Sequence, residues 1–158
     1  MSIFKRQASE FSDHLNSGER VMAAAPHSGG RLVATNFALL SFDNHENLRI
    51  PWELTLSAKW DESVLVVVSQ DEPNGTARTR AWKLDEPGLI PDTVRERITT
   101  AQVFDQVKDL PEVGKVRFLA RKSGQEISWS TLPQSEISPS SQTHIQNELN
   151  RLRQTLGI

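Results

Sequence analysis

The stretch Trp52–Trp60, WELTLSAKW, decides the fold class of this chain. Its even-numbered positions carry apolar side chains, and its odd-numbered positions carry polar or charged ones. Side chains alternate between the two faces of a β-strand, so this pattern buries one face in a core and leaves the other in water. In a helix, the same residues would spread around the circumference. We therefore predict a half-buried strand here, in which a bend could separate two shorter strands.

Further strand patterns flank this stretch on both sides, and each is bounded by turn residues. They predict strands over 19–26, 31–35, 38–42, 64–68, 77–84, 100–107, 113–121 and 126–132. The last two of these form a hairpin across Ser123-Gly124. The run Val64–Val68 is wholly apolar and mostly β-branched, which predicts a central strand that is buried on both faces or at an interface.

The hydrophobic period becomes helical near the end of the chain. Four apolar residues at i, i+4, i+7 and i+11 form one stripe: Ile145, Leu149, Leu152 and Leu156. Ser140 or Ser141 is the expected N-cap, and Gly157 is the expected end. Because the stripe must be buried, we expect this helix, over about 141–156, to pack against the sheet.

These elements predict a single α+β, mainly β domain over 18–158, preceded by a leader over 1–17 that is either helical or frayed. A short additional helix is expected over 91–99, where Pro precedes apolar residues four apart. The extra strands over about 100–132 either extend the main sheet or form a subdomain, and the pattern leaves both arrangements open.

Composition excludes several functional classes. The chain has 158 residues, enough for one hydrophobic core. Its net charge of −2 disfavours a nucleic-acid binder. The absence of cysteine excludes disulfides, thiol catalysis and thiolate-bound metals. The N-terminus lacks the apolar core of a signal peptide, so we expect a cytoplasmic protein, with peripheral contact to the membrane left open.

A set of short motifs in the first half carries a family resemblance. Gly18-Glu19 opens the first strand, LVATNFALL at Leu32–Leu40 forms a hairpin, and Ile50-Pro51-Trp52 begins a later strand. With these motifs, the stretch 19–60 resembles the bacterial pleckstrin-homology-like (PH-like) and GRAM-type domains. The hairpin of that family usually carries an arginine at the position of Phe37 or Ala38, and this chain departs from the family there.

The resemblance implies a fold and a class of function. The implied fold is a PH-like curved antiparallel sheet or half-open barrel of about seven strands, capped by a C-terminal amphipathic helix. The implied function is binding, which in some members means phosphoinositide binding through a basic cluster between early strands. The whole chain also resembles a group of actinobacterial proteins that end in Arg-x-x-Leu-Gly, here Arg153–Gly157, and that likeness implies no activity.

The chain carries no motif that predicts catalysis or a cofactor. No nucleophile elbow, P-loop or dinucleotide-binding motif is present. Glu10 with His14, and His27 with His45, are the pairs that a metal could use, but neither pair makes a complete ligand set. Solvated side chains explain both pairs, so we predict no catalytic, cofactor-binding or metal-binding residue.

Basic residues supply a candidate face for lipid or a partner. Arg78 and Arg80 lie two apart on one predicted strand, so both point to the same face. Lys59 and Arg31 lie on other strands of the first half. The alternative is a solvated outer face of the sheet, which the scatter of these residues favours.

The leading prediction is a non-catalytic binding or scaffolding module with a PH-like core that mediates protein–protein association, with a second copy of the chain among the candidate partners. Val64–Val68 and the C-terminal apolar stripe are the expected interfaces if either is left uncovered. One alternative is peripheral binding to anionic lipid through residues 3–6 and the Arg78/Arg80 face. Another is a small-ligand-binding barrel or an enzyme of an unrecognised type.

Overall fold

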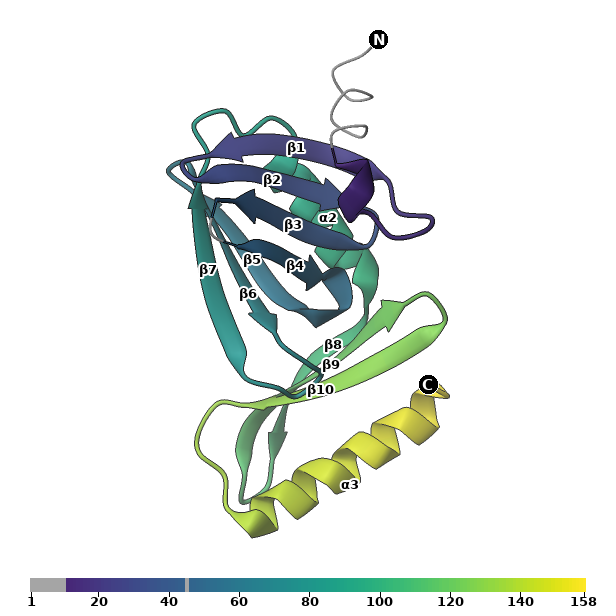
Figure 1. The fold of residues 1–158 in the computed structure, drawn as a ribbon. Coiled ribbons are helices and arrows are strands. Elements are labelled where there is room, and N and C mark those ends of the chain that lie inside the picture. Colours follow the sequence, from purple (N-terminus) through teal and green to yellow (C-terminus); the bar gives the residue numbers. More distant parts are fainter. Residues whose placement is uncertain (1–10, 45) are drawn as a thin grey trace.

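In the computed structural model, residues 11–44 and 46–158 are described. Most of the predicted leader over 1–17 therefore lies outside the described residues. Within them, ten strands form three antiparallel sheets that are not closed into a barrel, and the chain ends in a helix. The predicted mainly β fold with a C-terminal helix is confirmed (Figure 1).

The first sheet is a meander whose strands follow chain order: β1 (Val21–His27), β2 (Gly30–Thr35), β3 (Ala38–Asp43) and β4 (Asn47–Pro51). Its inner face contributes Leu32, Leu39 and Ile50 to the main core. Its outer face is also apolar, and Phe11 packs there by stacking on Phe42 with ring centroids 5.0 Å apart. Strand β4 ends at Ile50-Pro51 and Trp52 starts a 3₁₀ turn, so the prediction that Ile50-Pro51-Trp52 begins a strand is wrong.

The second sheet contains β5 (Thr55–Asp61), β6 (Val64–Gln70) and β7 (Ala77–Lys83), paired in that order. The strand predicted over 52–60 is shorter at its start, because Trp52–Leu54 forms the 3₁₀ turn η2. A register shift between Thr55 and Ser57 then bends β5. The predicted bend is therefore present, and the expected alternation holds after it.

Strand β6 contradicts the expectation that the run Val64–Val68 is buried on both faces. Leu65 and Val67 are buried in the core, whereas Val64, Val66 and Val68 are only half-buried on the outer face. The strand is central in its sheet but is buried on one face only. A wholly apolar run has no alternation to show this, because valine is tolerated on either face.

Helix α2 (Ile90–Ala101) covers the core between the first two sheets (Figure 1). Its buried residues lie on one side: Ile90, Val94, Ile98 and Ala101. They join the core cluster that includes Leu32, Leu65 and Trp52. The helix is longer than the predicted 91–99, so the strand expected from residue 100 begins two residues later.

The third sheet has the order β10 (Glu126–Pro133), β9 (Gly114–Ser123) and β8 (Gln102–Leu110). The predicted hairpin is confirmed, with Trp129 opposite Ala120. Helix α3 (Pro139–Leu156) packs on one face of this sheet, and the two share a separate core: Val116, Phe118, Ala120, Trp129, Ile145, Leu149 and Leu152. The C-terminal helix thus covers the third sheet, while α2 covers the first two.

The start of α3 corrects one prediction. Ser138, and not Ser140 or Ser141, is the N-cap, and its hydroxyl accepts a hydrogen bond from the Ser141 N–H (3.2 Å). Pro139 follows at the first helical position, where its missing N–H needs no partner. Gly157 ends the helix with a left-handed backbone, φ 72°, as predicted.

A buried polar junction joins the third sheet to the second. Arg121 of β9 is fully buried, and its guanidinium donates hydrogen bonds to the side chains of Gln70 (2.8 Å) and Ser130 and to the carbonyl of Thr55 (3.4 Å). No described residue accepts a hydrogen bond from its Nε. Burial lowers the pKa of Arg121 to about 10, so the side chain still carries its charge at neutral pH. A charged group thus holds two sheets together without a bonded carboxylate.

Acid pH is expected to loosen the docking of α3. Glu148 accepts hydrogen bonds from Arg151 and forms an ion pair with Lys108 of β8 (3.0 Å). These contacts, the Arg151 bond most of all, lower the pKa of Glu148 from 4.5 to about 2, although burial acts in the opposite direction. Because the pKa of Glu148 is lower in the folded state than in the unfolded state, its ionised carboxylate contributes its full stability at pH values above the unfolded-state pKa. This contribution is lost as pH falls from about 4.5 to about 2.

Urea unfolding of the E148Q variant across this pH range measures the effect. We expect a shallower loss of stability on acidification than in the parent chain, because the glutamine cannot take up the proton. E136Q, which changes an exposed loop carboxylate, is the matched control and should follow the parent curve. Identical slopes for E148Q and the parent would contradict the assignment.

Among the helices that the structure describes, none has the length and apolar composition that crossing a bilayer requires.

Candidate functional site

The structure divides the predicted basic face. Arg78 and Arg80 share the inner face of β7, as expected, because Arg80 lies opposite the core residue Val67. Lys59 lies opposite Val66, so it points from the other face of the same sheet. Arg31 belongs to the first sheet. The four residues therefore do not form one cluster.

The two arginines of β7 differ in their contacts. Arg78 donates two hydrogen bonds from Nε to the carboxylate of Asp71 (2.9 and 2.8 Å), and both side chains are exposed. Arg80 is half-buried and donates to the hydroxyl of Ser69 (3.2 Å). Arg80 thus has a neutral partner where Arg78 has an acidic one.

The histidine pairs considered from the sequence gain no support as a metal site. His27 ends β1, where Nε2 lies 3.2 Å from the Ser41 hydroxyl and Nδ1 accepts from the Gly29 N–H. His45 and Glu10 lie outside the described residues. Within 11–44 and 46–158, no group of three or more histidine or acidic residues is placed to hold a metal ion.

A groove of about 680 Å³ opens on the described surface. It lies between the β2–β3 corner, η2, the C-terminal end of α2 and the β9–β10 turn. Its lining comes from segments far apart in sequence: Asn16, Asn36, Phe37, Ala38, Arg49, Pro51, Trp52, Glu53, Arg97, Thr100, Ala101, Lys122, Ser123 and Gly124. The groove therefore lies between the first sheet, η2, α2 and the third sheet.

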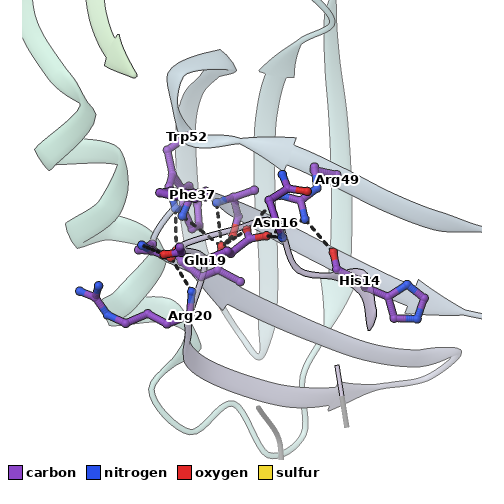
Figure 2. Close-up of polar contacts among 11 residues, drawn as sticks. His14, Asn16, Glu19, Arg20, Phe37, Arg49 and Trp52 are labelled. Atoms are coloured by element: carbon purple, nitrogen blue, oxygen red, sulfur yellow. Dashed lines mark hydrogen bonds and ion pairs between the residues drawn. The ribbon is translucent and has the colours of Figure 1, made fainter. Parts of the chain in front are cut away.

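A buried ion pair organises one wall of the groove (Figure 2). The side chain of Glu19 is fully buried, and both its oxygens accept from Arg49, at 2.9 and 2.7 Å. It also accepts from the Thr35 hydroxyl (2.5 Å) and the Asn16 N–H (2.9 Å). Arg49 also donates to the carbonyl of His14 (3.0 Å), so the pair fastens the segment before β1 to the first sheet.

The electrostatics of Glu19 follow from these contacts. Burial alone would raise its pKa, because it disfavours the charged carboxylate. The bonds from Arg49, Thr35 and Asn16 outweigh burial and lower the pKa below its usual value. The carboxylate is therefore ionised at neutral pH, and Arg49 is held at the groove wall with its charge balanced.

The floor of the groove is fixed by the backbone around Thr35. The Trp52 indole N–H donates to the Thr35 carbonyl (2.8 Å), and the Trp52 backbone N–H donates to the Phe37 carbonyl (3.2 Å). The Thr35 hydroxyl accepts from the N–H groups of Phe37 and Ala38. These bonds hold Phe37 in place although 43% of its surface is exposed. The exposed ring of Phe37 thus lines the groove from a corner that these bonds fix.

The lining of the groove contains three cationic residues and one acidic residue. The cations are Arg49, Arg97 and Lys122, the acidic residue is Glu53, and the charge of Arg49 is balanced by the buried Glu19. Arg97 bonds the exposed carboxylate of Glu96 (3.0 Å), and none of the described residues accepts a hydrogen bond from its buried Nε. The lining thus combines apolar surface with cationic groups and holds no histidine.

Comparison with protein-family models, with curated proteins and with solved structures found no match. The resemblance to PH-like domains therefore stays a prediction, and function must be inferred from the geometry of the groove.

The sequence did not point to this groove. Glu19 entered only as part of a Gly-Glu motif, and Asn36 only within the hairpin motif Leu32–Leu40. Arg97, Lys122 and Arg49 lie on elements whose separation along the chain gives no sign that they converge. The one available signal was Phe37, an aromatic residue at a tight turn where polar residues are usual.

Proposed function

We propose that the chain is a non-catalytic binding module with a PH-like core, and that its groove binds an acidic peptide segment of a protein partner. The observation that carries the proposal is the groove itself, whose lining combines apolar side chains with the cationic residues Arg49, Arg97 and Lys122. Such a concave, mostly apolar surface with a few placed polar groups is typical of a binding site.

The order of elements supports the PH-like core. Four strands form the first sheet, three strands form the second, and α2 follows at once and covers their shared core. The number of strands agrees with the arrangement that the resemblance implies. The capping helix expected there was the C-terminal one, and here α2 takes its place while α3 covers the third sheet. The third sheet and α3 are then an addition, and through the β9–β10 turn they form part of the groove wall.

The lining suggests the chemistry of the ligand. Phe37, Pro51 and Trp52 offer apolar and aromatic surface, which suits an apolar side chain. Arg97 and Lys122 favour negative charge beside it. An acidic peptide with a bulky apolar residue fits both features.

Anionic lipid is the weaker candidate. A membrane surface is flat, and it attracts basic residues that share one face. Arg31, Lys59 and the Arg78/Arg80 pair point from different faces of two sheets. The groove, in contrast, gathers its cations around a hollow, which suits a ligand that enters it.

The test uses two fluorescein-labelled peptides, DEFDE and its charge-reversed counterpart KKFKK. We expect the acidic peptide to bind, with NMR shift changes at the groove residues. K122E should weaken binding about fivefold or more, because charge reversal turns an attraction into a repulsion. F37A should also weaken it, because it removes the exposed ring.

Matched controls separate the groove from general effects. K59E makes the same charge change on β5, and L89A removes another exposed apolar side chain, at the opposite end of α2. Both should bind the peptide as the parent does. The proposal fails if shift changes map away from the groove, or if vesicles of anionic lipid bind with a dependence on Lys122 while neither peptide binds.

A further inference from the structure

Strand β7 offers a regular, unpaired sheet edge. It pairs with β6 along its whole length from Ala77 to Lys83 without a register shift. No described strand pairs with its other edge, and β7 forms the outer margin of the second sheet (Figure 1). Five of its seven residues are exposed. Its outward N–H and C=O groups are therefore open to another strand.

The other sheet edges carry irregularities. Register shifts lie at the start of three of them, β1, β5 and β8, at Val21/Ala23, Thr55/Ser57 and Gln102/Phe104. Strand β4 is short and ends at Pro51, which has no N–H to donate. On β10, the Thr131 N–H donates to the side chain of Asn74 (2.6 Å), so the β6–β7 turn contacts that edge. Such features hinder strand pairing, and β7 has neither a bulge nor a proline along its whole length, whereas β8 is regular only from Phe104 to Leu110.

The two faces of β7 would select different side chains in an added strand. Arg78 and Arg80 lie on the inner face, where the neighbouring residues of a new strand would gain from being acidic. Ala77, Thr79 and Ala81 lie on the outer face and are small and exposed. Apolar β-branched residues could pack there, beside the half-buried valines of β6.

Charge argues against pairing with a second copy. The strand contains three cations, Arg78, Arg80 and Lys83, and no acidic residue. Two antiparallel β7 strands would place these cations beside one another, which is destabilising. Charge repulsion thus disfavours pairing of β7 with a second β7, whereas an acidic strand would be attracted to this edge.

We infer that β7 is a second binding surface, distinct from the groove, that accepts an extended segment of another protein by β-strand addition. The segment alternates acidic residues, which lie beside Arg78 and Arg80, with apolar residues, which lie beside the alanines. Main-chain hydrogen bonds provide the pairing, and the alternation provides the specificity.

The probe is a peptide of the length of β7 that alternates glutamate with valine, and its counterpart alternates lysine with valine. We expect the glutamate peptide to slow amide hydrogen exchange along Ala77–Lys83, and the lysine peptide to have no effect. The double variant R78Q/R80Q should bind the glutamate peptide about tenfold more weakly, since it loses two charge contacts at an exposed edge.

The control is K59Q/R95Q, which removes two exposed cations, one on β5 and one on α2, and should change the affinity less than twofold. The groove variants F37A and K122E should leave it unchanged, so failure here and failure of the groove are distinguishable. The inference is overturned by equal binding of the two peptides, by exchange protection on another element, by unchanged affinity in R78Q/R80Q, or by concentration-dependent protection of β7 in the protein alone. If a variant does not fold, the comparison of hydrogen exchange in the parent chain with the glutamate peptide and with the lysine peptide still tests strand addition at β7.

Discussion

Replacing Arg121 with alanine is expected to lower the free energy of unfolding by about 3 kcal/mol, the largest effect of any polar substitution considered. The side chain fills the junction between the second and third sheets, and its guanidinium donates to Gln70, Ser130 and Thr55. Its loss leaves buried acceptors without their charged donor and opens a cavity. Removing the cation also removes its desolvation cost, which offsets part of the loss.

Two further variants separate these contributions. Arg121→Met restores much of the volume without the charge, so it should lose less stability than the alanine variant. R117A is the matched control, because Arg117 lies on the same strand and bonds Asp105 (2.8 Å) at a partly exposed position. Such a pair contributes about 1 kcal/mol or less. Chemical denaturation measures all three, and a loss below about 1 kcal/mol in R121A would contradict the role of the junction.

Replacing Glu19 with alanine is the second large effect, with an expected loss of about 2 to 3 kcal/mol. The buried carboxylate neutralises Arg49 and receives bonds from Thr35 and Asn16. Without it, the arginine is left partly buried without its counter-charge and the segment before β1 loses its attachment. Because Arg49 keeps some contact with water, the loss is smaller than for a fully buried pair.

The pH dependence of the same pair gives an independent check. The lowered pKa of Glu19 means that its contribution is present above about pH 4.5 and declines as pH falls through the lower folded-state value. E19Q should therefore be less stable than the parent chain at neutral pH, and the difference should shrink on acidification. E126A, at an exposed site, should match the parent throughout. A constant difference between E19Q and the parent across this range would contradict the ion-pair explanation.

Local patterns predicted much of the secondary structure because each depends on neighbours along the chain. Apolar and polar residues alternate on both strands of the hairpin over 113–132, and a Ser-Gly turn joins them, so the sequence predicts this hairpin. The stripe of α3 is visible in its spacing alone, and Ile145, Leu149 and Leu152 are buried as expected. Leu156, the last residue of the predicted stripe, is exposed at the end of the helix. Patterns were weaker where hydrophobicity does not alternate although burial does, as in Val64–Val68, and at Ile50-Pro51, which ends β4 instead of beginning a strand.

The candidate site could not be predicted in the same way. Its groove is built from five separated segments, and neither spacing nor periodicity records which of them meet. The Glu19–Arg49 pair spans thirty positions and the Arg121–Gln70 bond spans fifty-one. In the sequence, both arginines look like solvated charges. Only packing, which excludes water around them, turns them into buried partners.

The alternation in Trp52–Trp60 thus determined that this is a β-rich chain, and the C-terminal stripe determined that a helix must pack on a sheet. Those conclusions follow from the geometry of single elements. The tertiary structure alone decided that residues 52–54 turn before β5 begins, that the first sheet is covered on both faces, that α2 rather than α3 covers the first two sheets, and that a groove lies between the first sheet, α2 and the third sheet. The physical reason is that a hydrophobic face specifies burial but not its partner, whereas the partner is chosen by shape and by the pairing of buried polar groups.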